Sequence, residues 1–226
     1  MKHKSGIIWL IVFIIDAVLE LIAQWQGWFD VAMFTKPLLM PTLILYFVKS
    51  KDKISFSGGL IIIALLFSWA GDVFLMFQSD GQTIMFLFGL VSFLTAHVLY
   101  VWAFQLLSYP YTKNPIQFAI SALLVLFAGL LVLLLWPGLG NMEIPVMIYA
   151  AVISCMGISA VYRRGPGYNF ILIGALSFIA SDSILAYNKF FSPIEYGGVY
   201  IMATYLIGQL FIVTGALRFI LSLIHI

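Results

Sequence analysis

Long hydrophobic runs alternate with short polar breaks along almost the whole chain. The runs fall at about 6–25, 30–49, 56–79, 82–107, 115–136, 143–162, 168–190 and 195–221. Since a helix of about 20 apolar residues crosses the hydrocarbon of a bilayer, each run predicts one transmembrane helix. The connections are too short for a soluble domain. The pattern therefore predicts an all-α, polytopic membrane protein with eight transmembrane helices in a single domain, residues 1–226.

Composition points to the same class. Hydrophobic residues make up 63% of the chain and charged residues only 9%, whereas soluble domains carry about 25% charged residues. The first residues resemble a signal peptide, but Asp16 and Glu20 interrupt the apolar run and no small-residue cleavage site follows, which favours an uncleaved helix. We expect membrane lipids, and no nucleic acid, as partners.

Basic residues predict the orientation of the helices. Nine of the eleven lysines and arginines fall at the N-terminus, in alternate connections and near the C-terminus: Lys2, Lys4, Lys49, Lys51, Lys53, Lys113, Arg163, Arg164 and Arg218. Cytoplasmic loops carry an excess of lysine and arginine. Both termini are therefore predicted to be cytoplasmic, in the inner membrane if the chain is bacterial.

A faint internal repeat relates the two halves. Gly71-Asp72-x-x-Leu75 and Ser181-Asp182-x-x-Leu185 fall at matching places in the third and seventh predicted helices. Two alternatives stay open: a 4+4 parallel repeat of the kind seen in some transporters, or a chance match between apolar helices.

Ionisable residues inside the predicted helices lie at similar depths. Asp72, Asp182, Lys36 and Glu20 fall in the half away from the termini, and His97 lies nearer the midplane. An ionised side chain in a bilayer costs about 2.5–3.5 kcal/mol on insertion scales, so such groups are expected to face the bundle interior. Helical spacing aligns Glu20 with Asp16 and Gln24, and His97 with Gly89, Phe93 and Tyr100. The sequence predicts one shared polar pocket.

Structural roles for the same residues remain alternatives. Buried Asp–Lys or Asp–His pairs can hold helices together in lipid, and Lys36 can extend its ammonium group to the interface. His97 can be a hydrogen-bonded core histidine, Asp16 favours a structural role, and Glu20 fits either reading.

Other chemistries find little support. No histidine pair has helical metal-ligand spacing and Cys155 is the single cysteine, so neither a metal nor another cofactor is predicted. The chain also has no G-x-S-x-G elbow and no glycine-rich phosphate loop.

Several segments together resemble one family. "KPLLMP" (36–41), "FSWAGDVFLM" (67–76), "FLFGLVSFLTAHVLY" (86–100), "GALSFIASDSILAYNKF" (174–190) and "YLIGQLFIVTGA" (205–216) are similar to the YhhN-like family of membrane proteins, whose characterised members are lysoplasmalogenases. The resemblance implies hydrolysis of the vinyl ether bond of lysoplasmalogen, a lysophospholipid, to a fatty aldehyde and a glycerophospho-head group.

The resemblance also implies site residues. Asp72 and Asp182 match the catalytic positions, with His97, Ser181 and Lys36 as matching polar positions around them. Helical spacing adds Glu20 and Tyr100, so the predicted substrate-binding residues are Lys36, His97, Ser181, Glu20 and Tyr100. Protonation of the vinyl ether at carbon needs a positioned acid, which an aspartic acid kept neutral by apolar surroundings supplies. A second, ionised carboxylate can stabilise the resulting cation, as in glycosidases. The alternative is a proton-coupled transporter or lipid carrier that uses the same carboxylates.

The paired roles of the two aspartates require a particular geometry. Asp72 and Asp182 should face one cavity that His97 and Lys36 also line, with Glu20 at its rim. The cavity should narrow into an apolar slot for one hydrocarbon chain.

Overall fold

Eight α-helices occupy most of the residues that the computed structural model describes, which are 2–51, 53–78, 83–110 and 114–223. They are α1 (Lys2–Gln26), α2 (Phe29–Lys49), α3 (Phe56–Met76), α4 (Thr83–Leu106), α5 (Pro115–Leu139), α6 (Glu143–Tyr162), α7 (Tyr168–Phe190) and α8 (Gly197–Ser222), with the 3-10 helix η1 (Gly140–Met142) between α5 and α6. No strand occurs in these described ranges. The all-α prediction is confirmed, and helix ends lie within a few residues of the hydrophobic runs.

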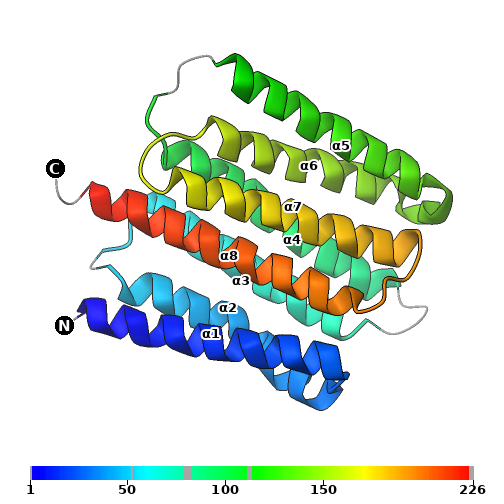
Figure 1. The fold of residues 1–226 in the computed structure, drawn as a ribbon, viewed down its shortest axis with the longest axis horizontal. Helices are drawn as coiled ribbons and strands as arrows, with labels where there is room; N and C mark the ends of the chain where they lie inside the picture. Colours follow the sequence, from blue (N-terminus) through cyan, green and yellow to red (C-terminus); the bar gives the residue numbers. More distant parts are fainter. Residues whose placement is uncertain (1, 52, 79–82, 111–113, 224–226) are drawn as a thin grey trace.

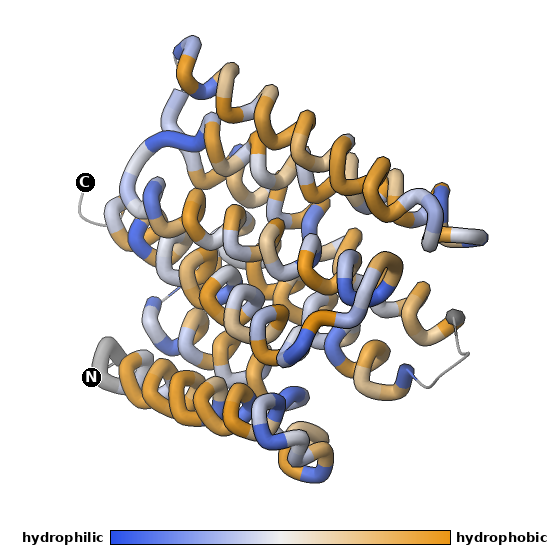
Figure 2. Tube along the Cα trace, turned by 45° about the vertical axis from the view of Figure 1, so that its right-hand side comes forward, coloured by the Kyte–Doolittle hydropathy of each residue, from blue (hydrophilic) through white to orange (hydrophobic). Residues whose placement is uncertain are grey.

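Seven stretches of the described chain are long and apolar enough to cross a membrane. Six are single helices, and the seventh, Pro115–Tyr162, is 48 residues long and comprises α5, η1 and α6. Figure 2 shows hydrophobic residues along the lengths of the helices and hydrophilic residues mainly near their ends. Because so large an exposed apolar surface requires lipid around it, the chain is a multi-pass integral membrane protein.

The helices form four hairpins that run along one axis (Figure 1). The closest neighbours are α1 with α2, α3 with α4, α5 with α6, and α7 with α8. In the view of Figure 1, α7 and α8 lie in front of α4 and α3, between the α1–α2 and α5–α6 hairpins. The start of α1 and the end of α8 lie together at what we call the terminal end, and the α1–α2 and α7–α8 connections lie at the far end.

Glycines bring α7 and α8 into backbone contact. A Cβ atom added to Gly174 would lie 2.9 Å from the carbonyl oxygen of Gly208, and one on Gly208 would lie 3.1 Å from that of Gly174. Seven residues after Gly208 in α8, a Cβ on Gly215 would lie 2.9 Å from the carbonyl oxygen of Gly167. Small residues permit this close packing of helices in lipid, and their spacing of seven fixes the register of the two helices.

Gly174→Ala is therefore expected to destabilise the fold by about 1–3 kcal/mol, because the added methyl group meets backbone that cannot turn aside. Gly129→Ala in α5 is the matched control, since nothing lies within 4 Å of a Cβ at that position and alanine favours the helix. Thermal unfolding in detergent measures both variants. Equal melting temperatures for the two would contradict this account of the contact.

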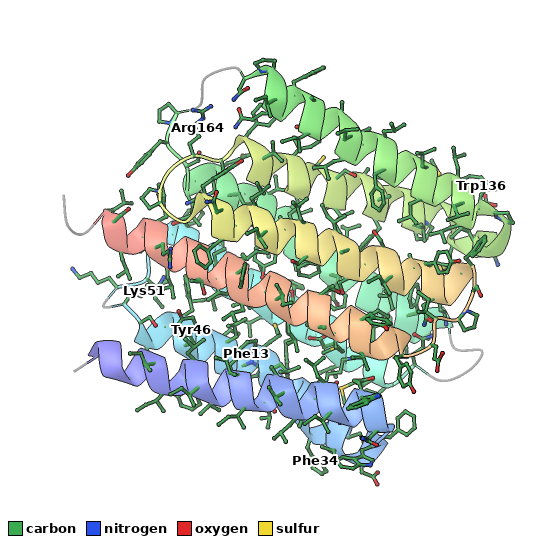
Figure 3. All side chains as sticks on the ribbon, in the orientation of Figure 1. Phe13, Phe34, Tyr46, Lys51, Trp136 and Arg164 are labelled. Atoms are coloured by element: carbon green, nitrogen blue, oxygen red, sulfur yellow. The ribbon has the colours of Figure 1, made fainter. Side chains whose placement is uncertain are left out.

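Lys51 lies buried just after α2, at the terminal end (Figure 3). Its Nζ is 3.6 Å from the centre of the Phe47 ring and has no hydrogen-bond partner in the described structure. Burial lowers the pKa of the Lys51 amine from 10.5 to about 8. Between these two values the unfolded chain holds a proton that the folded chain has released, so stability rises with pH across that interval.

The free energy of unfolding is accordingly expected to increase from pH 8 towards pH 10 by up to about 3 kcal/mol, at about 1.4 kcal/mol for each pKa unit. The melting temperature should rise with it. Lys51→Met should remove this increase, whereas Lys49→Met, at an exposed position two residues earlier, should keep it. A wild-type profile that stays flat or falls between pH 8 and pH 10 would contradict the expectation.

Candidate active site

Lys36 and Asp72 are brought together by an irregularity in α2. This helix contains Pro37 and Pro41, and because Pro41 has no backbone N–H, the Pro37 carbonyl loses its usual helical partner. The indole Nε1 of Trp69 donates to that carbonyl at 2.9 Å. The bond ties α2 to α3 next to Lys36 and one turn before Asp72.

Asp182 is positioned by the contact between α7 and α8. Ser181 lies seven residues beyond Gly174, on the face that meets α8, and its Oγ donates to the Ile201 carbonyl at 2.9 Å. This bond fixes the rotation of α7 at the residue before Asp182. Ser181 is 2% exposed, so its hydroxyl proton is committed to the backbone of the neighbouring helix.

Both aspartates line one cavity of about 180 Å³, which we call the polar cavity. Gln78, near the end of α3, and Gly198, near the start of α8, also line it, which places the cavity towards the far end of the bundle. Its polar lining residues come from α1, α2, α3, α7 and α8 and the residues just after α3: Gln24, Lys36, Asp72, Gln78, Ser181, Asp182 and Tyr205. Among the described lining residues, Lys36 is the single cation.

Asp72 is held on one oxygen and is electrostatically linked to the other charges. Tyr205 Oη donates to Asp72 Oδ2 at 2.6 Å, and the Asp72 side chain is buried. The charges that act on its carboxyl are the opposite charge of Lys36 and the like charges of Glu20 and Asp182. The two catalytic candidates are therefore close enough to influence one another.

Asp182 has two partners on its buried side. Tyr149 Oη donates to Asp182 Oδ2 at 2.6 Å, and His97 Nε2 lies 3.3 Å from the same oxygen. His97 Nδ1 contacts the Phe93 carbonyl oxygen, which can only accept a hydrogen bond, so Nδ1 is assigned the proton. The imidazole then faces Asp182 with Nε2.

A second space, which we call the apolar slot, adjoins the polar cavity at Asp182. It lies between α4, α5, α6 and α7 and is lined mostly by aliphatic and aromatic side chains. Four residues line both spaces: Leu75, Phe93, Asp182 and Leu185. The two spaces therefore meet at the Asp182 carboxyl.

The prediction that Asp72, Asp182 and Lys36 share a cavity is confirmed, and Ser181 joins them. His97 does not line it, contrary to expectation, because the imidazole lies behind Asp182 in fully buried surroundings. Glu20 is also not at the rim. It is fully buried and accepts hydrogen bonds from Gln24 Nε2 at 2.8 Å and Thr35 Oγ1 at 2.5 Å.

Tyr100 is placed elsewhere. Its hydroxyl donates to Gln209 Oε1 at 2.5 Å, and Gln209 Nε2 donates to Ser68 Oγ at 3.0 Å. This buried set links α3, α4 and α8 and contributes no Tyr100 atom to the lining of the polar cavity. Its placement favours a structural role over contact with a substrate.

Sequence reasoning missed the two tyrosines that hold the aspartates, Tyr149 and Tyr205. One signal was available, since a tyrosine inside an apolar helix needs a partner for its hydroxyl. Which acceptor each would find depended on helix neighbours that the sequence does not state. In the described part of the chain, no three His, Cys, Asp or Glu side chains gather as metal ligands.

Fold and site together define an all-helical integral membrane protein with a buried, carboxylate-lined cavity that adjoins an apolar slot. The YhhN family matches residues 31–216, and the chain belongs to this family. No solved structure matches the chain significantly.

Three curated relatives illustrate the similarity. Lysoplasmalogenase TMEM86A of Bos taurus is 32% identical over 170 residues, which are 72% of this chain and 67% of that protein. Lysoplasmalogenase TMEM86B of Homo sapiens is 34% identical over 72% of this chain and 66% of its own length. Lysoplasmalogenase of Mycobacterium tuberculosis is 34% identical over 69% of this chain and 59% of its own length.

Proposed function

We propose that this protein is a membrane hydrolase that cleaves the vinyl ether bond of lysoplasmalogen or a related lysolipid, giving a fatty aldehyde and a glycerophospho-head group. The observation that carries the proposal is the junction at Asp182 between the polar cavity and the apolar slot. A lysoplasmalogen has the matching shape, because its vinyl ether joins a polar glycerophospho-head to one hydrocarbon chain. The relatives' names support the same reaction class.

Asp182 is the proton donor in this proposal. The carboxylic acid proton of Asp182, which lines the cavity, moves to C2 of the alkenyl chain, the carbon next to the C1 atom that carries the ether oxygen. The double-bond electrons form the new C–H bond, an oxygen lone pair closes the C1=O⁺ bond, and Asp182 is left as carboxylate. The hydrogen bond from Tyr149 Oη holds Asp182 Oδ2 in place. General acid catalysis of this kind contributes typically 10²–10⁴-fold to a rate.

Asp72 is the stabilising carboxylate. Lys36 lines the same cavity and supplies a positive charge to accompany a carboxylate at Asp72. Negative charge facing C1 lowers the energy of the oxocarbenium ion. Water then attacks C1 and gives one proton to the Asp182 carboxylate, which restores the acid. The hemiacetal breaks its bond to the glycerol oxygen and releases the aldehyde.

Lys36 has a second role when the lysolipid is bound. As the one cation of the described lining, it is placed to meet the phosphate of the head group as a point charge. Gln24 and Gln78 add hydrogen-bonding groups on the side of the cavity nearest the far end.

The topology forms part of the proposal. If the 48-residue stretch Pro115–Tyr162 crosses twice, with its turn at η1, the chain crosses eight times. An even number agrees with the terminal end that α1 and α8 share (Figure 1). The basic side chains labelled in Figure 3, Lys51 and Arg164, lie at that end, which supports a cytoplasmic terminal end. Matching hairpins in the two halves support a 4+4 repeat.

The test is aldehyde release by purified protein from a 1-alkenyl lysolipid, with the 1-alkyl lysolipid of the same chain and head group as control. We expect aldehyde from the alkenyl lipid alone, with and without a chelator, because the saturated ether offers no carbon to protonate. Uptake of the lipid into proteoliposomes without any aldehyde would instead favour the carrier alternative. Cleavage of both ethers would contradict carbon protonation.

A further inference from the structure

A large groove lies at the opposite end of the molecule from the polar cavity. It has a volume of about 740 Å³ and lies between α4 and α6 near the terminal end. Val101, Phe104 and Ile158 form its apolar part, and Gln105, Ser108 and Arg163 lie on its polar part. This division resembles that of a lipid, with hydrocarbon on one side and a head group on the other. We call it the terminal-end groove.

Arg163, the residue that follows α6, is an unusual member of this lining. Its side chain is 1% exposed, although arginine is almost never fully buried without a partner. Nη2 donates to the Pro166 carbonyl at 2.8 Å, but Nε and Nη1 have no hydrogen-bond partner in the described structure. The guanidinium carbon lies 5.0 Å from the centre of the Phe219 ring, a contact that leaves these N–H groups unsatisfied.

Nothing in the described surroundings neutralises this cation. No acidic residue lines the terminal-end groove. Burial lowers the pKa of Arg163 to about 10, so the guanidinium remains charged at neutral pH. A buried charge without a counter-ion is costly, whereas an arginine that meets phosphate forms charge-assisted hydrogen bonds.

We propose that the terminal-end groove binds a membrane phospholipid with a net negative head group, whose phosphate meets Arg163 and whose acyl chain lies along Val101, Phe104 and Ile158. An anionic lipid fits better than a zwitterionic one, because its net negative head group compensates the Arg163 guanidinium, beside which no described acidic residue lines the groove. This lipid site is separate from the polar cavity and does not depend on the proposed hydrolysis. Its occupant is a resident lipid, which is not cleaved there.

The experiment measures lipid binding to the purified full-length protein in detergent by native mass spectrometry, with thermal unfolding as a second readout. The probes are phosphatidylglycerol, phosphatidylcholine with the same acyl chains, and inorganic phosphate. We expect phosphatidylglycerol to bind and to raise the melting temperature, and Arg163→Gln to weaken that binding about tenfold or more, the value of a charged hydrogen bond. Arg218→Gln is the matched control. It removes a positive charge at the same end, where Arg218 packs 3.9 Å from the Phe170 ring centre, and should bind nearly as wild type.

Ile158→Trp provides an independent arm should Arg163→Gln fail to fold. It fills the apolar part of the groove without touching the guanidinium, and should also weaken phosphatidylglycerol binding. Equal binding of phosphatidylglycerol and phosphatidylcholine would overturn the proposal. So would equal stabilisation by inorganic phosphate, or unchanged phosphatidylglycerol binding in Ile158→Trp and in a folded Arg163→Gln.

Discussion

Asp182→Asn is expected to lower kcat for lysoplasmalogen cleavage by about 10²–10⁴-fold, the contribution of a positioned general acid. Asparagine fits the same space and can still meet Tyr149 and His97, but it has no acidic proton to give to carbon. Because Lys36 and the apolar slot are unchanged, KM should change little. Steady-state kinetics of aldehyde release measure both constants.

Asp16→Asn is the matched control for this variant. Asp16 is also a buried aspartate in a predicted membrane helix, with one carboxylate oxygen that lacks a hydrogen-bond partner, but it lines neither the polar cavity nor the apolar slot. It should retain near-normal turnover. An Asp182→Asn enzyme with more than a tenth of wild-type kcat would return Asp182 to a structural role in joining α7 to α4 and α6.

Asp72→Asn is expected to lower kcat by about 10²–10³-fold, the usual effect of removing one electrostatic stabiliser of a transition state. The amide can keep the contact with Tyr205 but loses the negative charge that faces the oxocarbenium ion. Since the two carboxyls act in one step, the double variant Asp72→Asn/Asp182→Asn should be only slightly slower than the slower single variant. Fully multiplicative losses would contradict a joint site.

The depth of the candidate residues could be predicted from the sequence, but their neighbours could not. Position along a hydrophobic run indicates depth, and this was sufficient to group Asp72, Asp182 and Lys36 in one cavity. The rotation of each helix depends on contacts between helices, such as that of Gly174 with Gly208. No periodic pattern in these uniformly apolar runs reports such contacts.

His97 and Tyr100 illustrate the limit. Both lie on the polar face that the spacing of α4 predicts. His97, however, contacts Asp182 on the side away from the polar cavity, and Tyr100 donates a hydrogen bond to Gln209. A shared face predicts which residues point inward, but it does not identify which of several inward partners each will contact. Tyr149 was missed for a different reason, because its neighbours in α6 are apolar and no polar stripe marks its face.

If Asp182 delivers a proton to one face of the alkenyl C2 carbon, the stereochemistry at C2 must record it. The reaction is run in D₂O, and the aldehyde is reduced to the alcohol in situ before it can exchange. The single deuterium at C2 is then assigned by NMR after conversion to a chiral ester. A carboxyl fixed by Tyr149 in the polar cavity predicts one C2 enantiomer in large excess. A racemic product would mean that C2 takes its proton from solvent without guidance from the protein, and would contradict the account.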